Sequence, residues 1–215
     1  MYITKQQVQQ ALGKMQGFDR ELTALFGSYG MDFEGNTGRR NVLLSQAQEH
    51  FLAEEIRKQF PSTRSDGRTG EPDISIPEIG KTLECKLTTP SATGALRLQS
   101  DKEAFAAGDK DFIYFIADDR MQRFAVLHFA GLRRDDFSDC KESARGRVKM
   151  RKSKTFDRCT VLHGSYEPRS AKMIESIDAQ LARTRPGSKS HAKLLQRRQH
   201  WDEADESFTL NLLPL

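Results

Sequence analysis

The sequence predicts a mixed α/β fold of the α+β type, in which helices flank a central mixed sheet of about four to five strands. Residues 73–77 and 82–88 alternate between apolar and polar side chains, which is the period of strands with one buried face. Residues 111–116 are almost continuously apolar, as expected of a central strand buried on both faces, and 123–129 form a further strand. Residues 41–59 place apolar side chains at helical spacing and predict an amphipathic helix.

The composition is that of a polar protein with one sizeable core. The chain has 215 residues, of which 37% are hydrophobic and 30% are charged. No apolar run reaches the length of a membrane span, no signal-peptide pattern is present, and none of the cysteines lies in a CxxC pair. These features predict a cytoplasmic protein without a disulfide framework. The net charge of +4 permits nucleic-acid binding without proving it.

A single domain with three parts is expected. Residues 1–40 form a helical lead, in which two helices are separated near Gly17 and followed by a glycine-rich loop. Residues 41–130 hold the amphipathic helix and the strands described above. Residues 131–215 begin with a basic segment and end with two helical patterns that Pro186-Gly187 separates.

The strands at 73–77 and 82–88 predict a hairpin that gathers polar side chains. Because side chains alternate between the two faces of a strand, Glu84 and Lys86 share one face, while the opposite face is apolar. Cys85 lies on that apolar face and is expected to be a small buried side chain. Asp73 precedes the first strand, where its carboxylate can join Glu84 and Lys86 across the hairpin.

Two carboxylates and a lysine in this arrangement suit metal-dependent phosphodiester hydrolysis. Mg²⁺ binds oxygen ligands and usually keeps several waters and a substrate phosphate in its shell. Such an ion polarises the phosphoryl oxygen and lowers the pKa of a bound water. Lys86 would supply positive charge to the transition state or orient the attacking water. The alternative is a surface hairpin with an ordinary ion pair between Glu84 and Lys86.

Pro72-Asp73 followed by Glu84-Cys85-Lys86 resembles the motif of the PD-(D/E)xK nuclease superfamily, over roughly residues 41–130. Asp139-Cys140-Lys141 also fits the second half of the motif, but it lies in a polar segment without strand alternation. The resemblance implies a restriction-endonuclease-like core and a Mg²⁺ or Mn²⁺ ion held by Asp73, Glu84 and the backbone carbonyl of Cys85. It also implies that hydrolysis leaves 5′-phosphate and 3′-hydroxyl ends.

The resemblance further implies an acidic residue on the first core helix, near the metal. Glu49 lies just before the apolar pair Phe51-Leu52 of that helix and is the candidate for this accessory ligand. Glu54 and Glu55 compete for the role, and a solvent-exposed helix carboxylate is the alternative without function.

Basic residues with few acids among them gather in residues 141–158 and predict a surface that contacts DNA. The residues of this segment expected to contact the duplex are Arg145, Arg147, Lys149, Arg151, Lys152 and Lys154. If the segment is extended, its alternate charges lie on one face and can follow phosphates or enter a groove. The alternative is a solvated basic loop.

Two further pairs of residues are candidates for DNA contacts. Arg39 and Arg40 end the glycine-rich loop and offer guanidinium forks to phosphate. Arg97 and Gln99 follow the motif strand and lead into a short helix predicted to end near Ala107. Their place after the motif is where relatives of the superfamily often contact the scissile strand.

These features predict a type II restriction enzyme, a Mg²⁺-dependent, sequence-specific endonuclease that acts on double-stranded DNA. Palindromic sites have two-fold symmetry, so this prediction implies a homodimer. A junction resolvase or a repair or phage nuclease is the alternative within the superfamily. A DNA-binding protein without catalysis, in which Asp73, Glu84 and Lys86 form a structural ion pair, is the alternative from another class.

Overall fold

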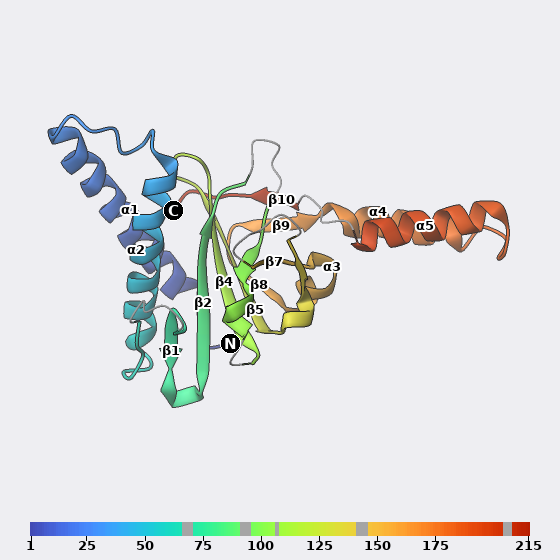
Figure 1. The fold of residues 1–215 in the computed structure, drawn as a ribbon, viewed down its shortest axis with the longest axis horizontal. Coiled ribbons are helices and arrows are strands. Elements are labelled where there is room, and N and C mark those ends of the chain that lie inside the picture. The colour runs from blue at the N-terminus through green and yellow to red at the C-terminus, as the bar shows by residue number, and fades with distance from the viewer. Residues whose placement is uncertain (66–70, 91–95, 106–107, 141–145, 204–207) are drawn as a thin grey trace.

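The computed structural model describes all residues except 66–70, 91–95, 106–107, 141–145 and 204–207 (Figure 1). The helices are α1 (Lys5–Ser28), α2 (Thr37–Arg57), the single-turn α3 (Lys152–Thr155), α4 (Arg169–Leu181) and α5 (Lys189–Glu203). The strands are β1 (Ile74–Ile76), β2 (Lys81–Thr88), β3 (Gln99–Asp101), β4 (Lys110–Ala117), β5 (Phe124–Leu132), β6 (Phe137–Asp139), β7 (Arg147–Met150), β8 (Cys159–His163), β9 (Ser165–Pro168) and β10 (Phe208–Asn211). Across these described ranges, no helix combines the length and the apolar character that a bilayer crossing requires.

A mixed five-stranded sheet in the order β1-β2-β4-β5-β8 forms the centre of the molecule. Strands β2 and β4 run parallel, and all other neighbours in this sheet are antiparallel. The parallel register sets Glu84 beside Phe112 and Lys86 beside Tyr114. The predicted α+β class with a mixed central sheet is therefore confirmed.

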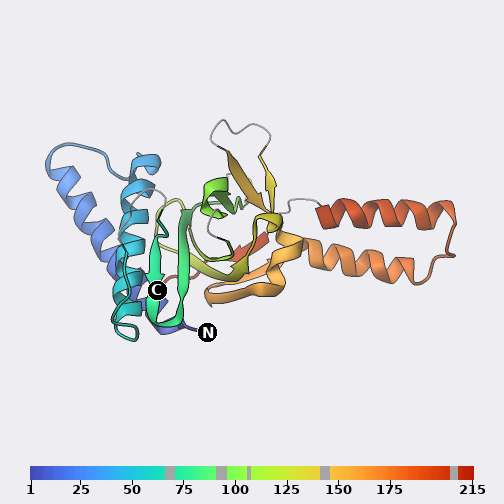
Figure 2. The ribbon, with the colours of Figure 1, turned by 60° about the horizontal axis from the view of Figure 1, so that its bottom comes forward.

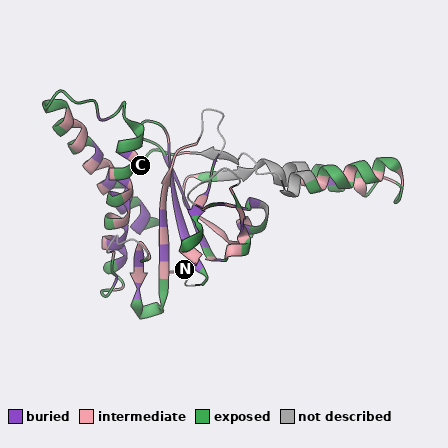
Figure 3. Ribbon diagram, in the orientation of Figure 1, coloured by how far each residue is buried: buried purple, intermediate pink, exposed green. Residues whose placement is uncertain are grey.

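Strand β4 is buried along its whole length, as its apolar sequence predicts (Figure 3). One face of the sheet packs against α1 and α2, and the predicted apolar side chains Leu83 and Cys85 are buried in this core. The opposite face packs, through Phe112 and Tyr114, on the small antiparallel sheet β3-β7-β6. Glu84 and Lys86 share this opposite face with their register partners on β4.

The helical lead differs from the prediction in two ways. Helix α1 is a single helix, because Gly17 adopts helical backbone angles within it and does not break it. Its N-terminus is stabilised as expected by Thr4, whose side chain accepts a hydrogen bond from the backbone amide of Gln7 in a capping box. Helix α2 begins at Thr37, with Asn36 as its N-cap, so Arg39 and Arg40 belong to its first turn and not to a loop.

The segment after the motif strand also differs from the prediction. In place of a helix, residues 99–101 form the short strand β3, followed by a 3₁₀ turn at Lys102–Phe105. Strand β3 pairs with β7, which is the only extended part of the basic segment within the described residues. Val148 and Met150 of β7 are buried. The burial of these two apolar side chains explains why residues 147–150 are extended, whereas the charges of the segment alone do not show where a strand begins or ends.

The C-terminal part forms a two-helix hairpin on a β-ribbon. Strands β9 and β10 pair antiparallel and enclose α4 and α5, whose positions match the two predicted helices. Figures 1 and 2 both show the α4–α5 hairpin projecting away from the central sheet. The chain after β10 returns to the sheet, where Leu213 exchanges two backbone hydrogen bonds of 2.9 Å with Phe124 of β5.

Candidate active site

The end of β1 creates the local geometry of the site. Strand β1 pairs with β2 only as far as Leu83, so the backbone of β2 beyond that residue has no strand on this side. Asp73, which directly precedes β1, fills the gap: its Oδ2 accepts a hydrogen bond of 2.7 Å from the backbone amide of Cys85. The hairpin therefore holds the carboxylate of Asp73 against the strand that carries Glu84 and Lys86.

Lys86 lies between the two carboxylates. Its Nζ donates a hydrogen bond of 2.6 Å to Oε1 of Glu84 and lies 3.9 Å from Oδ2 of Asp73. On the other side of Glu84, Nζ of Lys110 lies 3.9 Å from Oε2. The three residues singled out from the sequence are thus brought together, and Lys110 of β4 joins them.

Burial and mutual repulsion set the charge balance of this cluster. Burial and the neighbouring Glu84 carboxylate raise the pKa of Asp73 above its usual value, although Lys86 and the Cys85 amide partly oppose this. Burial tends to lower the pKa of Lys86, but the carboxylates of Glu84 and Asp73 outweigh it, and the net pKa is raised. Lys86 is therefore protonated at neutral pH, and at this pH it acts as a hydrogen-bond donor and not as a base.

Helix α2 contributes Glu49 to the same cluster. Burial, followed by the negative charge of Asp73 and that of Glu84, raises the pKa of Glu49 to about 7, while Lys86 lowers it. The competing residues have other partners: Nζ of Lys14 lies 2.9 Å from Oε1 of Glu54 and 2.7 Å from Oε1 of Glu55. The structure therefore selects Glu49 among the acidic residues that the helical pattern left open.

The carboxylates near Lys86 are of the chemical type that a hard divalent cation prefers. Asp73, Glu84 and Glu49 offer carboxylate oxygens, and their mutual repulsion is the condition that a bound cation relieves. In the part of the chain that the structure describes, no group of three or more His, Cys, Asp or Glu side chains is arranged so that it could hold a metal ion. A cation here would complete its shell with a backbone oxygen, water and phosphate, as Mg²⁺ usually does.

A basic pocket opens beside Lys86. It has a volume of about 280 Å³, and its lining includes Lys86, Tyr114, Arg97, Gln99 and Arg147. Arg97 and Arg147 are exposed and line the same pocket, although fifty residues separate them in the chain. Three of the predicted DNA-contacting residues thus lie next to the candidate catalytic lysine.

Other predicted DNA-contacting residues are differently placed. Lys149 is half-buried, and burial lowers its pKa; the positive charge of nearby Arg97 acts in the same direction, although Cys140 opposes it. Arg39, Arg151 and Lys154 are exposed. Arg145 lies outside the described residues.

Two of the predicted contacts are wrong. Arg40 is 2% exposed, because its guanidinium binds the carboxylate of Asp19 in the core between α1 and the β4–β5 turn. Lys152 is 6% exposed and donates a hydrogen bond of 2.6 Å to the carbonyl oxygen of Leu96. Both cations bind groups of the protein itself and cannot reach a phosphate without breaking these contacts, which would leave a buried carboxylate or carbonyl without its partner.

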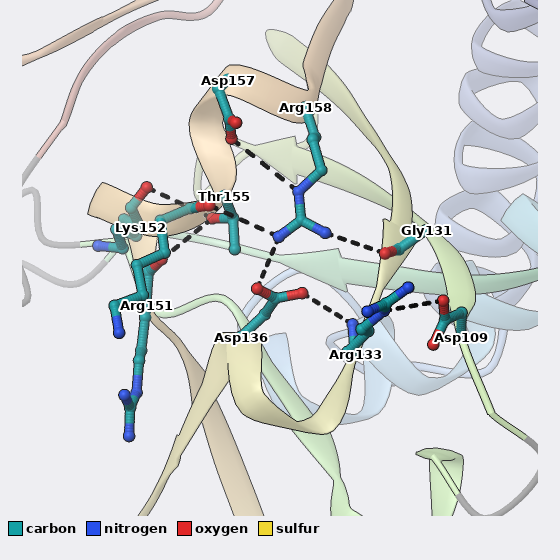
Figure 4. A network of polar contacts seen from close by, with 10 residues as sticks. Asp109, Gly131, Arg133, Asp136, Arg151, Lys152, Thr155, Asp157 and Arg158 are labelled. Carbon is teal, nitrogen blue, oxygen red and sulfur yellow. Dashed lines mark hydrogen bonds and ion pairs between the residues drawn. The ribbon is translucent and has the colours of Figure 1, made fainter.

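Figure 4 shows the polar network that holds part of the basic segment. Arg158 turns inward: it donates a hydrogen bond of 2.9 Å to the carbonyl oxygen of Gly131 and lies 2.6 Å from Oδ1 of Asp136. Arg151 extends away from this network (Figure 4). The sequence shows the accumulation of charge, but only the fold distinguishes cations that bind the protein itself from those that face outward.

Sequence reasoning missed Lys110 and Tyr114. Both belong to β4, and the side chain of Lys110 is only 8% exposed beside Glu84. Burial, with a smaller effect of the Glu84 carboxylate, raises the pKa of the Tyr114 phenol, so it stays neutral in the pocket. Lys110 at the start of an apolar strand was the one available signal, since a lysine there needs a nearby carboxylate.

Comparison with known proteins gives no further guide to function. No family model matches the chain, and no curated protein and no solved structure matches it either. The chemistry of the residues gathered along β2 is the basis on which a function can be assigned.

Proposed function

We propose that the protein is a Mg²⁺- or Mn²⁺-dependent DNA endonuclease of the PD-(D/E)xK type. One observation carries this proposal: Lys86 lies 2.6 Å from Glu84 and 3.9 Å from Asp73 at the border of a pocket lined by arginines. Metal-dependent hydrolysis of a polyanion requires two acidic ligands, a cation next to them and a basic surface beside both.

Each residue has a separate task. Asp73 and Glu84 would hold the metal ion, with Glu49 and the backbone carbonyl of Cys85 as further ligands. When bound, the ion polarises the phosphoryl oxygen and acidifies water. Lys86, as a protonated donor, stabilises the negative charge that develops on the phosphate and orients the attacking water. Hydrolysis leaves 5′-phosphate and 3′-hydroxyl ends.

The pocket supports a polyanionic substrate. Arg97 and Arg147 are exposed on its wall, where a guanidinium can bind phosphate oxygens in a bidentate manner. Gln99 lines the same pocket and can form hydrogen bonds to base edges or to sugar and phosphate oxygens. Duplex DNA would therefore place one phosphate beside Lys86 and a neighbouring phosphate beside the arginines.

A restriction-type enzyme is the specific form of this proposal, and it requires two copies of the chain. Large apolar side chains are exposed near the end of α1 and the start of α2, and such a patch is the kind of surface that a second copy would cover. These side chains are Leu25, Tyr29, Met31 and Val42. Cutting of linear duplex into discrete fragments would distinguish this form from a junction resolvase, which prefers branched DNA.

The closed ion pair between Lys86 and Glu84 favours one rival, a DNA-binding protein without catalysis. The two are separated by incubating the protein with a long linear duplex in Mg²⁺ and in chelator, and sequencing the product ends. A nuclease cuts only with the metal. Lys86→Ala should abolish cutting and leave binding in chelator largely intact, whereas Lys5→Ala, which removes an exposed lysine of α1, should cut normally. If the protein binds DNA but does not cut it in Mg²⁺ or in Mn²⁺, the proposed enzymatic activity is refuted.

A further inference from the structure

The α4–α5 hairpin is a strongly basic projection. Its basic residues between Ile174 and Gln199 are Arg183, Arg185, Lys189, Lys193, Arg197 and Arg198, and its acidic residues there are Glu175 and Asp178. The hairpin extends away from the sheet on the β9–β10 ribbon, and the described part of α5 is mostly exposed (Figures 1, 2 and 3). None of these cations belongs to the candidate active site.

The two helices hold each other through internal contacts. Ile177 of α4 is 1% exposed, and α4 and α5 pack against each other. Arg198 donates a hydrogen bond of 2.6 Å from Nε to Oδ1 of Asp178. Arg198 and Asp178 therefore link the two helices of the hairpin. The other basic side chains of the hairpin do not take part in this contact and can bind a ligand.

The exposed cations form a row. Lys189, Lys193 and Arg197 are four residues apart on α5, so they lie on one side of the helix with a rise of about 6 Å between neighbours. Arg183, in the turn that follows α4, joins Lys193 and Arg197 in lining one shallow pocket. All four side chains are exposed, and no ion pair links any of them to another residue that the structure describes.

This row suits the phosphates of a duplex. The row presents three cations over about 12 Å, and a B-DNA strand, which rises about 3.4 Å per nucleotide along the helix axis, offers several phosphates within that length. A membrane surface would need an apolar face beside the cations, but Leu195 is the one large apolar side chain exposed in the described part of the hairpin. A stable protein interface would likewise need an apolar centre.

We infer that the α4–α5 hairpin is a second DNA-contacting arm, which binds the phosphate backbone of duplex flanking the active site through Lys189, Lys193, Arg197 and Arg183. The arm contributes affinity without reading sequence, because lysine and arginine contacts to phosphate position the protein and do not specify bases. The inference rests on the proposed function in one respect, that the ligand is duplex DNA.

Binding is measured in chelator, where no cutting occurs, by fluorescence anisotropy with duplexes of about 12 and about 40 base pairs over a range of salt concentrations. The test variant is Lys189→Ala with Lys193→Ala and Arg197→Ala. The matched control removes three other exposed cations, Lys5→Ala with Arg20→Ala and Arg123→Ala. Circular dichroism verifies that the helices of each variant are intact.

The arm variant should bind the long duplex at least about 10-fold more weakly, and the slope of log affinity against log salt should decrease by about 2 to 3, since each lost phosphate contact removes about 0.9. Its affinity for the short duplex and both affinities of the control variant should be unchanged. Lys189→Arg with Lys193→Arg should bind as the unmodified chain does, because the charge row is kept.

The inference would be overturned by any of three results for the arm variant: an unchanged affinity for the long duplex, an unchanged salt slope, or an equal loss of affinity for both duplexes. The same holds if the arm variant loses affinity only for vesicles of phosphatidylserine. Failure of the proposed nuclease has a different signature: the unmodified chain binds DNA and shows the arm effect, yet Mg²⁺ produces no cutting.

Discussion

Asp73 has two roles that a single carboxylate performs at once. Its Oδ2 accepts the backbone amide of Cys85 at 2.7 Å, so it completes the hydrogen bonding of β2 where β1 has ended. The same oxygen lies 3.9 Å from Nζ of Lys86, so it also belongs to the charged cluster. The structural role needs an acceptor, whereas the proposed catalytic role needs a negative charge.

Two substitutions of Asp73 should separate these roles. Asp73→Asn keeps an acceptor for the Cys85 amide and removes the charge, so thermal unfolding should change little while Mg²⁺-dependent cutting falls at least about 100-fold. Asp73→Ala leaves the Cys85 amide without its partner and should also lose about 1–3 kcal/mol of unfolding free energy. Cutting by Asp73→Asn at the rate of the unmodified chain would exclude Asp73 as a ligand.

Asp111, which directly follows Lys110 at the start of β4, is a second informative residue. Burial by itself raises its pKa, but contacts with His128, the backbone amide of Gly131 and the hydroxyl of Tyr2 outweigh this and lower the pKa to about 2. The hydroxyl of Tyr2 donates a hydrogen bond of 2.9 Å to Oδ2, and the amide of Gly131 donates one of 2.8 Å to Oδ1. The ionised carboxylate therefore ties the residues before α1 to the sheet.

A depressed pKa in the folded state predicts acid sensitivity. The stabilisation from Asp111 is fully present above the usual carboxyl pKa near 3.8 and is lost as the pH falls through about 2. The unfolding free energy of the unmodified chain should exceed that of Asp111→Asn by about 2 kcal/mol at pH 6, and this difference should shrink between pH 4 and pH 2. Urea unfolding of both proteins measures it. A difference that is constant with pH would contradict the assignment.

At the scale of elements, the site depends on a strand hairpin that ends early. Strand β1 has only three residues, so β2 extends past it and exposes an edge that Asp73 occupies and that Glu49 of α2 approaches. The turn of this hairpin passes through Gly80 at φ +59°, a left-handed conformation that L side chains rarely adopt. No atom lies within 4 Å of the position that a Cβ would take, so a side chain would have room there. The left-handed backbone conformation is therefore the reason for a glycine in this turn.

A matched pair of glycine substitutions tests these elements. Gly80→Ala should cost about 1 kcal/mol, since it forces an alanine into the left-handed region. Gly17→Ala, within the uninterrupted helix α1, should instead gain about 0.5–1 kcal/mol, because alanine has the higher helix propensity and its methyl group has room. Chemical denaturation of both variants gives the two values. Destabilisation by Gly17→Ala would argue against a continuous α1.

At the scale of the whole molecule, three regions surround the sheet: the helical pair α1–α2 on one face, the small β3-β7-β6 sheet on the other, and the projecting α4–α5 hairpin (Figure 1). The basic surfaces belong to the second and third of these regions. The exposed apolar side chains Leu25, Tyr29, Met31 and Val42 belong to the first. DNA contact and self-association would therefore use different parts of the molecule.

This separation predicts the behaviour of a self-association variant. If the chain is a homodimer through the first region, Val42→Glu should shift it from dimer to monomer in sedimentation equilibrium, because a charge would be buried in an apolar contact. Leu195→Glu, at a similarly exposed apolar position on α5, should remain dimeric. A monomeric unmodified chain at micromolar concentration would remove the structural argument for a restriction-type dimer.

The sequence by itself determined the types of the main elements, the buried faces of β2 and β4, the cap of α1 and the three residues of the hairpin site. These follow from periodicity and from groups close together in the chain, which local sequence encodes directly. Only the tertiary structure decided that Glu49 and not Glu54 or Glu55 faces the site. It also placed Lys110 beside Glu84, brought Arg97 and Arg147 to the lining of one pocket, and buried Arg40 and Lys152. Each of these depends on contacts between segments distant in the chain, and a local pattern of charge cannot show whether a cation will bind the protein's own core or face outward.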